Sequence, residues 1–216
     1  MKTDMELQRE VINELKREPS VNSAEIGVAV KDGAVTLSGY VDSFGEKRAA
    51  ERSAAKMKNV KAIADGIQVR LPASGRHDDA DIAREAANLL AWNTFVPRDA
   101  VKVIVEDAWV TLTGDVGMWY QKWNAETALH NIAGIRGITN EIEIKPETEA
   151  KEVRVELVDA LGRNALLDSR TIDVEAEGSR IVLRGTVRSW LEREEAEFAA
   201  HSSPGVSVVD NHILVE

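Results

Sequence analysis

The sequence predicts an α+β protein built from three tandem α-β-β-α-β modules, each a three-stranded sheet with two helices on one face. A short apolar strand ending in glycine occurs three times, and its glycines Gly39, Gly114 and Gly185 lie 75 and 71 residues apart. Apolar residues recur at matching offsets on both sides of each glycine. Such internal periodicity is typical of repeat architectures. The predicted modules span residues 1–74, 75–147 and 148–216.

Each module is predicted to begin with an amphipathic helix. Apolar residues recur every four positions there, which places them in one stripe along a helix. The stripe consists of Leu7, Val11 and Leu15 in the first module, Ile82, Ala86 and Leu90 in the second, and Val153, Leu157 and Leu161 in the third. Polar residues surround the stripe, so we expect one face of this helix to pack on the sheet.

A β-hairpin is predicted next. Ile26, Val28 and Val30 alternate with smaller or polar residues, as in a strand with one buried face. A tight turn at Gly33 then leads into the strand that ends at Gly39.

The second helix has a clear beginning and end. Ser43 and Ser189 each stand three residues before a glutamate, which is the capping-box pattern, whereas Met118 replaces the serine in the second module. A residue suited to a left-handed turn ends each helix: Asn59, Gly134 or Gly205. A final alternating strand follows, with Ile67 and Val69, Ile142 and Ile144, or Ile213 and Val215.

This order of elements, the V-x-L-x-G strand and the glycine-valine pair before the last strand resemble the BON domain. Residues 109–116 and 184–190 carry the resemblance, which covers residues 5–216 as three tandem copies. It implies an OsmY-like protein, because the family is associated with osmotic stress, the cell envelope and phospholipid binding. It implies no catalytic residues, since the family has no shared catalytic set.

Composition excludes several classes of protein. Residues 1–75 carry a net charge of +1, residues 76–147 of −5 and residues 148–216 of −6, which together give −10. An acidic surface repels phosphate backbones, so nucleic-acid binding is disfavoured. The chain has no cysteine, and therefore no disulfide or thiol nucleophile. No apolar run reaches the ~20 residues of a membrane span, and the N-terminus lacks a secretory signal. We expect a cytoplasmic protein, or a periplasmic one only if a leader has been removed.

The polar residues show no catalytic or metal-binding motif. The four histidines form no ligand pair, and His130 and His201 occupy equivalent positions where the first module has Ala55. Acidic residues such as Asp78 and Asp79 precede a helix, where they favour its positive end. We therefore expect no enzyme, no metal and no cofactor.

The aromatic residues are the best candidates for recognition. Phe44, Trp119 and Trp190 share one position at the start of the second helix, where a staple-like contact is expected. Trp119, Tyr120 and Trp123 form a dense patch that we predict to be the interaction site, with part of it accessible to a partner.

A second aromatic group is expected on the open face of the middle sheet. Trp109, Ile104 and Thr111 point away from the predicted helices. Only this module has an open face apolar enough to be covered, so we predict that these residues form an inter-repeat contact and that Trp109 is buried.

The sequence thus predicts a non-enzymatic binding or scaffolding protein linked to osmotic or envelope stress, with a protein partner or a phospholipid headgroup as its ligand. The alternative is a cytoplasmic sensor that binds a small ligand or a cation through its acidic repeats.

Overall fold

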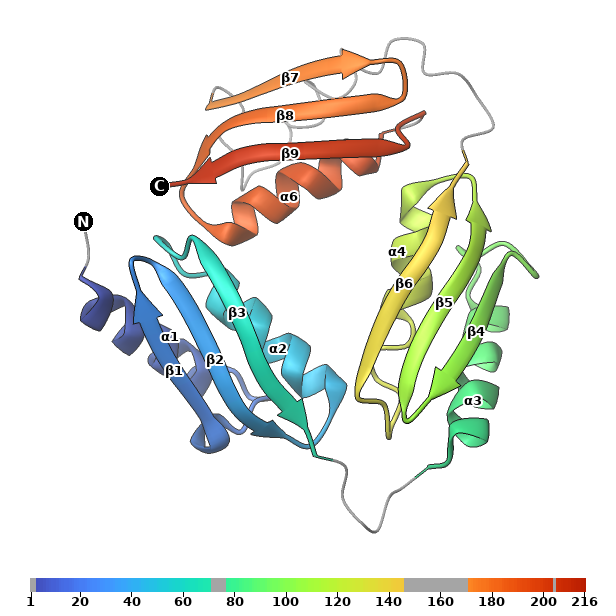
Figure 1. The fold of residues 1–216 in the computed structure, drawn as a ribbon, viewed down its shortest axis with the longest axis horizontal. Helices are drawn as coiled ribbons and strands as arrows, with labels where there is room; N and C mark the ends of the chain where they lie inside the picture. The colour runs from blue at the N-terminus through green and yellow to red at the C-terminus, as the bar shows by residue number, and fades with distance from the viewer. Residues whose placement is uncertain (1–2, 71–76, 146–170, 204) are drawn as a thin grey trace.

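The computed structural model describes residues 3–70, 77–145, 171–203 and 205–216, which form three α+β modules arranged around a ring (Figure 1). The first module contains α1 (Asp4–Arg17), a short 3-10 turn (Ser23–Glu25), β1 (Ile26–Lys31), β2 (Ala34–Val41), α2 (Phe44–Ala55) and β3 (Ala62–Val69). The second contains α3 (Asp79–Trp92), β4 (Val101–Glu106), β5 (Trp109–Val116), α4 (Trp119–Thr127) and β6 (Gly137–Ile144). The third contains β7 (Ile172–Glu177), β8 (Arg180–Val187), α6 (Trp190–His201) and β9 (Val208–Val215).

The predicted fold class is confirmed. Each module has one sheet of three strands, in the orders β1-β2-β3, β4-β5-β6 and β7-β8-β9. The predicted first helix of the third module, with Val153, Leu157 and Leu161, lies outside the described residues.

The third strand of each sheet runs parallel to the second. β1 and β2 form an antiparallel hairpin, whereas β2 and β3 are parallel, and the other two sheets repeat this pattern. A parallel neighbour needs a crossover connection, and the second helix of each module supplies it. This helix therefore packs on one face of the sheet between the second and third strands in sequence, and its two ends lie at the two ends of the sheet.

Each module has its own apolar core. The stripe residues Leu7, Val11 and Leu15 of α1 are buried, as are Ile82, Ala86 and Leu90 of α3. The leucine at the centre of each second strand is fully buried, and these residues are Leu37, Leu112 and Leu183. Alanines of α2, α4 and α6 allow close approach to the sheet, including Ala54, Ala125 and Ala196.

The predicted helix caps are present in the first and third modules. The side chain of Ser43 accepts a hydrogen bond from the amide of Glu46 at 3.1 Å, and Ser189 does the same for Glu192 at 3.2 Å. Each glutamate accepts in return from the amide one residue before the serine. In the second module Met118 provides no side-chain cap, as predicted from the missing serine.

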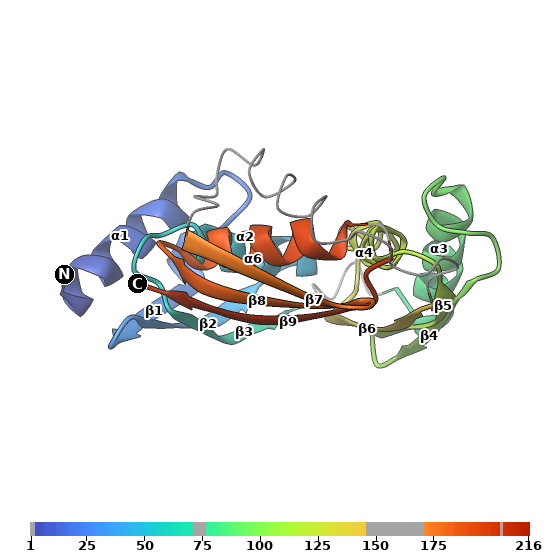
Figure 2. The same cartoon turned by 90° about the horizontal axis from the view of Figure 1, so that it is seen from above.

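The ring has two different sides. Seen edge-on, the helices lie on one side and the three sheets on the other (Figure 2). The hairpin strands β1, β4 and β7 form the outer rim, and the edge strands β3, β6 and β9 border the centre (Figure 1). The open faces of all three sheets therefore face the same way.

The glycine that revealed the repeat has a structural role. Gly39, Gly114 and Gly185 have φ angles of +121°, +132° and +132°, a region that residues with a side chain rarely adopt. A Cβ atom at Gly39 would overlap the carbonyl oxygen of Glu25, and the other two glycines lie against equivalent carbonyls. Glycine is thus required where the second strand passes the start of the first.

We predict that Gly39→Ala destabilises the chain by about 2–4 kcal/mol, because it adds backbone strain to a steric overlap with main-chain atoms. Urea unfolding followed by circular dichroism would measure the loss. Gly27→Ala is the matched control, since a Cβ there would meet the Oγ atom of Ser38 at 3.0 Å and its carbonyl oxygen at an ordinary 3.7 Å. Equal stability of the two variants would contradict this role for Gly39.

Candidate functional site

The three second helices are packed head to tail around the ring. The start of α2 lies against the end of α4, the start of α4 against the end of α6, and the start of α6 against the segment after α2 (Figure 1). Each module therefore contacts both of the others. We name these contacts the 1–2, 2–3 and 3–1 junctions.

The 1–2 junction is formed by Phe44 of the first module. Its ring meets the His130 imidazole edge-on, with 5.6 Å between ring centres. Phe44 is only 7% exposed, and it packs with the core residues of the second module rather than those of its own. The expectation of a staple within its own module is therefore wrong, because this position points out of the module and into its neighbour.

The 2–3 junction is an aromatic cluster. Trp119 stacks on His201 at 5.1 Å with 11° between the ring planes, and it meets Phe198 edge-on at 4.9 Å. Trp123 stacks beside Trp119 at 6.3 Å and contacts Phe198 at 5.5 Å. The residues of the predicted interaction patch thus lie at a contact between modules, where Trp123 and Tyr120 remain partly accessible.

The 3–1 junction uses the backbone instead of a histidine. Ala55 stands at the position of His130 and His201, and the amide of Asn59 donates to the carbonyl oxygen of Arg188 at 3.3 Å. An antiparallel bridge also pairs Lys58 with Ser189. This junction joins the first module to the last and closes the ring.

The prediction for Trp109, Ile104 and Thr111 is wrong. Trp109 is 47% exposed and Ile104 is also exposed, because every open sheet face points to one side of the ring and no described element of another module covers it (Figure 2). The Trp109 indole instead lies over Gly137 of the neighbouring strand, and its Nε1 donates to the Thr139 hydroxyl at 2.8 Å. Trp109 is therefore accessible where burial was expected, while the Trp119, Tyr120 and Trp123 group both contributes to a contact between modules and stays partly accessible.

Two further exposed aromatic residues, Trp92 and Phe95, were not among the residues predicted from the sequence. Trp92 is 86% exposed at the end of α3, and Phe95 is 58% exposed and meets Tyr120 edge-on at 6.3 Å. Together with Trp123 they extend the accessible aromatic surface on the helix side of the second module. The repeat itself could have pointed to them, because the equivalent positions of the first module hold the polar residues Arg17 and Ser20.

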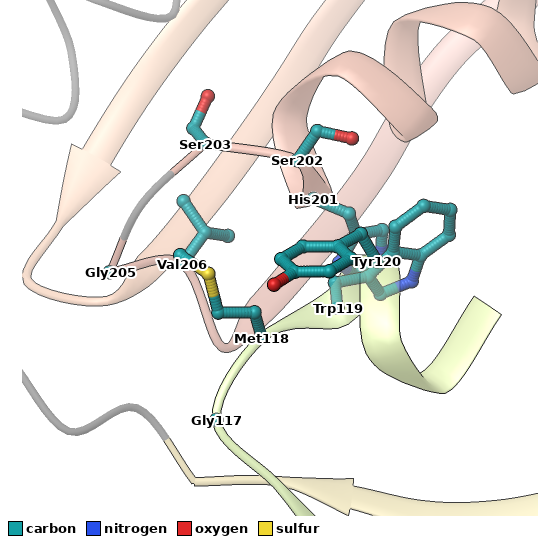
Figure 3. A pocket seen from close by; sticks show the side chains of 9 residues that line it. All are labelled: Gly117, Met118, Trp119, Tyr120, His201, Ser202, Ser203, Gly205 and Val206. Atoms are coloured by element: carbon teal, nitrogen blue, oxygen red, sulfur yellow. The ribbon is translucent and has the colours of Figure 1, made fainter. Parts of the chain in front are cut away.

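Two hollows lie at the 2–3 junction. A cavity of about 10 Å³ lies between the start of α4 and the turn after α6, and its lining includes Met118, Tyr120, Ser202, Ser203 and Val206 (Figure 3). A groove of about 630 Å³ lies between the edge strands β6 and β9. Trp119 and His201 line both.

Both junction histidines lie beside a glutamate of their own helix. The His130 imidazole lies 3.6 Å from Glu126, and it holds the pKa of this carboxyl below its ordinary value, helped by the Asn140 amide and opposed by burial. Burial lowers the pKa of His201 from its ordinary value of 6.5; the Glu197 carboxylate opposes this shift and the Lys122 ammonium reinforces it. The Nδ1 atom of His201 is buried and has no hydrogen-bond partner among the described residues.

Neither metal chemistry nor a membrane span is built into the described part of the chain. No group of three or more acidic or histidine side chains there is placed to hold a metal ion. Within the same ranges, none of the helices combines the length and the hydropathy needed to cross a bilayer.

We predict that Trp119→Ala weakens the 2–3 junction by about 2 kcal/mol, because it removes an aromatic contact that buries apolar surface. Urea unfolding monitored by tryptophan fluorescence should then show an early transition as the third module separates. Trp109→Ala is the control, since its indole lies over Gly137 and donates to Thr139 of its own module. One unchanged transition in Trp119→Ala would contradict this account of the junction.

Stability should also fall in mild acid. A base with a lowered folded-state pKa stays neutral in the folded chain, whereas the unfolded chain takes up a proton as the pH falls through about 6.5. The His201 contribution is therefore present above this pH and is lost below it, until the folded form is also protonated. Melting temperatures between pH 7.5 and 5 would show this, and His201→Gln should remove part of the fall. An identical pH profile in His201→Gln would contradict the assignment.

The chain is similar to known proteins over most of its length. The family model described as BON domain matches residues 3–70, 78–146 and 150–216. Osmotically-inducible protein Y of Escherichia coli (strain K12) is 30% identical over 131 residues. The match covers 58% of this chain and 65% of that protein, so the chain spans less than two thirds of the relative's length.

Two solved structures also align with the chain. They are of CdsD, a structural protein of the type III secretion system of Chlamydia trachomatis, and of its C-terminal domain. The first covers 98% of this chain and 92% of CdsD at 15% identity and a TM-score of 0.27, and the second covers all of both chains at 14% identity and 0.26. Neither superposition says anything about the role of this chain. The three family matches together span nearly all of it, and the chain belongs to the BON-domain family.

Proposed function

We propose that this chain is a non-enzymatic binding and scaffolding protein of the OsmY-like type, active in osmotic or envelope stress. We further propose that it binds a protein partner through the aromatic surface formed by Trp92, Phe95, Tyr120 and Trp123. The name of its E. coli relative supports the link to osmotic stress. The exposure of these four side chains on one module is the observation that supports the site.

The chemistry of this surface favours a protein partner. Large aromatic side chains dominate the energetic hot spots of protein interfaces, and a nearly fully exposed tryptophan is costly to keep in water. The second and third modules carry net charges of −5 and −6, so a partner with a neutral or basic contact surface would be attracted to them. The rigid ring would hold this surface in a fixed orientation.

A phospholipid surface is the second candidate. Five exposed apolar side chains lie on the open sheet faces, which share one side of the ring: Tyr40, Ile104, Trp109, Val208 and Leu214. A flat side of this kind fits a membrane surface geometrically. The net charge of −10 opposes anionic lipid, so we rank this candidate below the protein partner.

A photo-crosslinking amino acid introduced in place of Phe95 should form discrete covalent adducts between this chain and a partner protein in cells after an osmotic upshift. The same amino acid in place of Ile104 is the matched control, because Ile104 is exposed on β4 of the same module while its neighbours Val103 and Val105 pack on the core side of the sheet. Adducts from position 104 alone would contradict the proposed surface. Flotation with liposomes that is lost in Ile104→Ser but kept in Phe95→Ser would favour the lipid candidate instead.

The alternative of a cation or small-ligand sensor has its own test. A ligand that binds only the folded chain raises the melting temperature by mass action. A shift with K⁺, Ca²⁺ or Mg²⁺, without any adduct from position 95, would favour the sensor over the scaffold.

A further inference from the structure

One basic side chain of the ring lacks the partner that its equivalents have. The position lies on the second helix of each module and is occupied by Lys47, Lys122 and Arg193. Lys47 donates to the carbonyl oxygen of Ile67 at 2.9 Å and pairs with Asp65 at 2.5 Å.

Arg193 in the third module is held in a similar way. Its Nε donates to the carbonyl oxygen of Ile213 at 3.1 Å, and its Nη2 donates to that of Asn211 at 2.8 Å. Both equivalents are thus fixed to the edge strand of their own sheet.

Lys122 is not held in this way. Asn140 stands where the first module has the charged Asp65; the third module also has an asparagine there, Asn211, but its Arg193 is anchored by backbone carbonyl oxygens instead. The Asn140 amide donates to the Lys122 carbonyl oxygen at 3.0 Å and to Glu126 at 3.1 Å, and offers no charge to the lysine. The Lys122 ammonium makes no hydrogen bond or ion pair with any residue of the described ranges, although the side chain is half-buried. A half-buried charge without a partner is unfavourable, and an incoming anionic group would supply the missing contact.

Lys122 lines the 630 Å³ groove at the 2–3 junction, and a carboxylate lines the same groove. Glu141 of β6 is exposed there and has no ion-pair partner within the described part of the chain, whereas Glu143 pairs with Lys145 at 3.5 Å. The groove therefore presents one unpaired positive and one unpaired negative side chain. A purely anionic ligand would be repelled by the glutamates, and a purely cationic one by Lys122.

The walls of the groove suit a short peptide. Trp119, Ile144 and Val208 supply apolar surface, and the volume falls within the range of small-molecule sites. The strands on both sides, β6 and β9, are edge strands of their sheets. The free edge of a strand can pair with the backbone of an extended peptide.

We propose that this groove binds a short zwitterionic peptide with apolar side chains. Its terminal carboxylate would contact Lys122, its terminal ammonium would contact Glu141, and its side chains would pack on Trp119 and Val208. This site is separate from the surface of the proposed partner, so either proposal can fail without the other.

Calorimetric titration of the full chain with the dipeptide Leu-Leu would test the proposal. Binding is expected with free termini, and affinity should fall at least tenfold when the amino end is acetylated or the carboxyl end is amidated. Lys122→Met and Glu141→Gln should each cause a similar loss. Lys122→Arg, which keeps the charge, and Lys102→Met, an exposed residue outside the groove, should bind like the unchanged chain.

Three results would overturn the proposal. They are no heat of binding with Leu-Leu, equal affinity for the capped peptides, and binding that Lys122→Met leaves unchanged. Circular dichroism of each variant separates a lost site from a lost fold. A variant that fails to fold is replaced in the comparison by the capped peptides, which alter the same two contacts from the ligand's side.

Discussion

The rest of the architecture depends on one contact, the start of a second helix packed against the end of the second helix in another module. A module of about 70 residues buries too little surface to be very stable alone. Phe44 shows how the ring offsets this weakness, because it completes the core of a neighbour instead of its own. Three such contacts close the three modules into a ring, so that each module has two neighbours. An open array of three would leave both terminal modules with only one.

The three junctions occupy the same repeat positions and differ in chemistry. In two of them an aromatic ring contacts a histidine: Phe44 contacts His130, and Trp119 contacts His201. The third has Ala55 at the histidine position, and a backbone bridge joins the two modules there. The 2–3 junction has the most aromatic contacts, and it is also where the cavity and the groove lie.

One polar residue on the edge strand of each module shows how similar modules can carry different side-chain chemistry. An acidic or amide residue of each edge strand, Asp65, Asn140 or Asn211, accepts the hydrogen bond of the amide two residues later. The backbone therefore has the same shape in all three modules. The charge of this residue is free to vary: Asp65 pairs with Lys47, whereas the uncharged Asn140 and Asn211 carry no charge to pair with a basic side chain, and Arg193 is held by backbone carbonyl oxygens. A backbone shape shared by the three modules, with side chains that differ between them, allows each module to take a different role.

The sequence by itself determined the repeat, the order of the elements, the buried stripes and the helix caps, because each of these depends on contacts between residues close in the chain. It also indicated Trp119 and Trp123 as members of a dense aromatic patch, whereas His201 stood out only by sharing its repeat position with His130. It could not determine which aromatic group is covered. Trp109 projects from a face that no helix of its module covers, and its exposure depends on all three sheets facing one side of the ring. Only the tertiary structure decided this, since the direction in which modules pack is set by contacts between residues far apart in the chain, such as Phe44 with His130 and Trp119 with His201, and no local pattern carries that information.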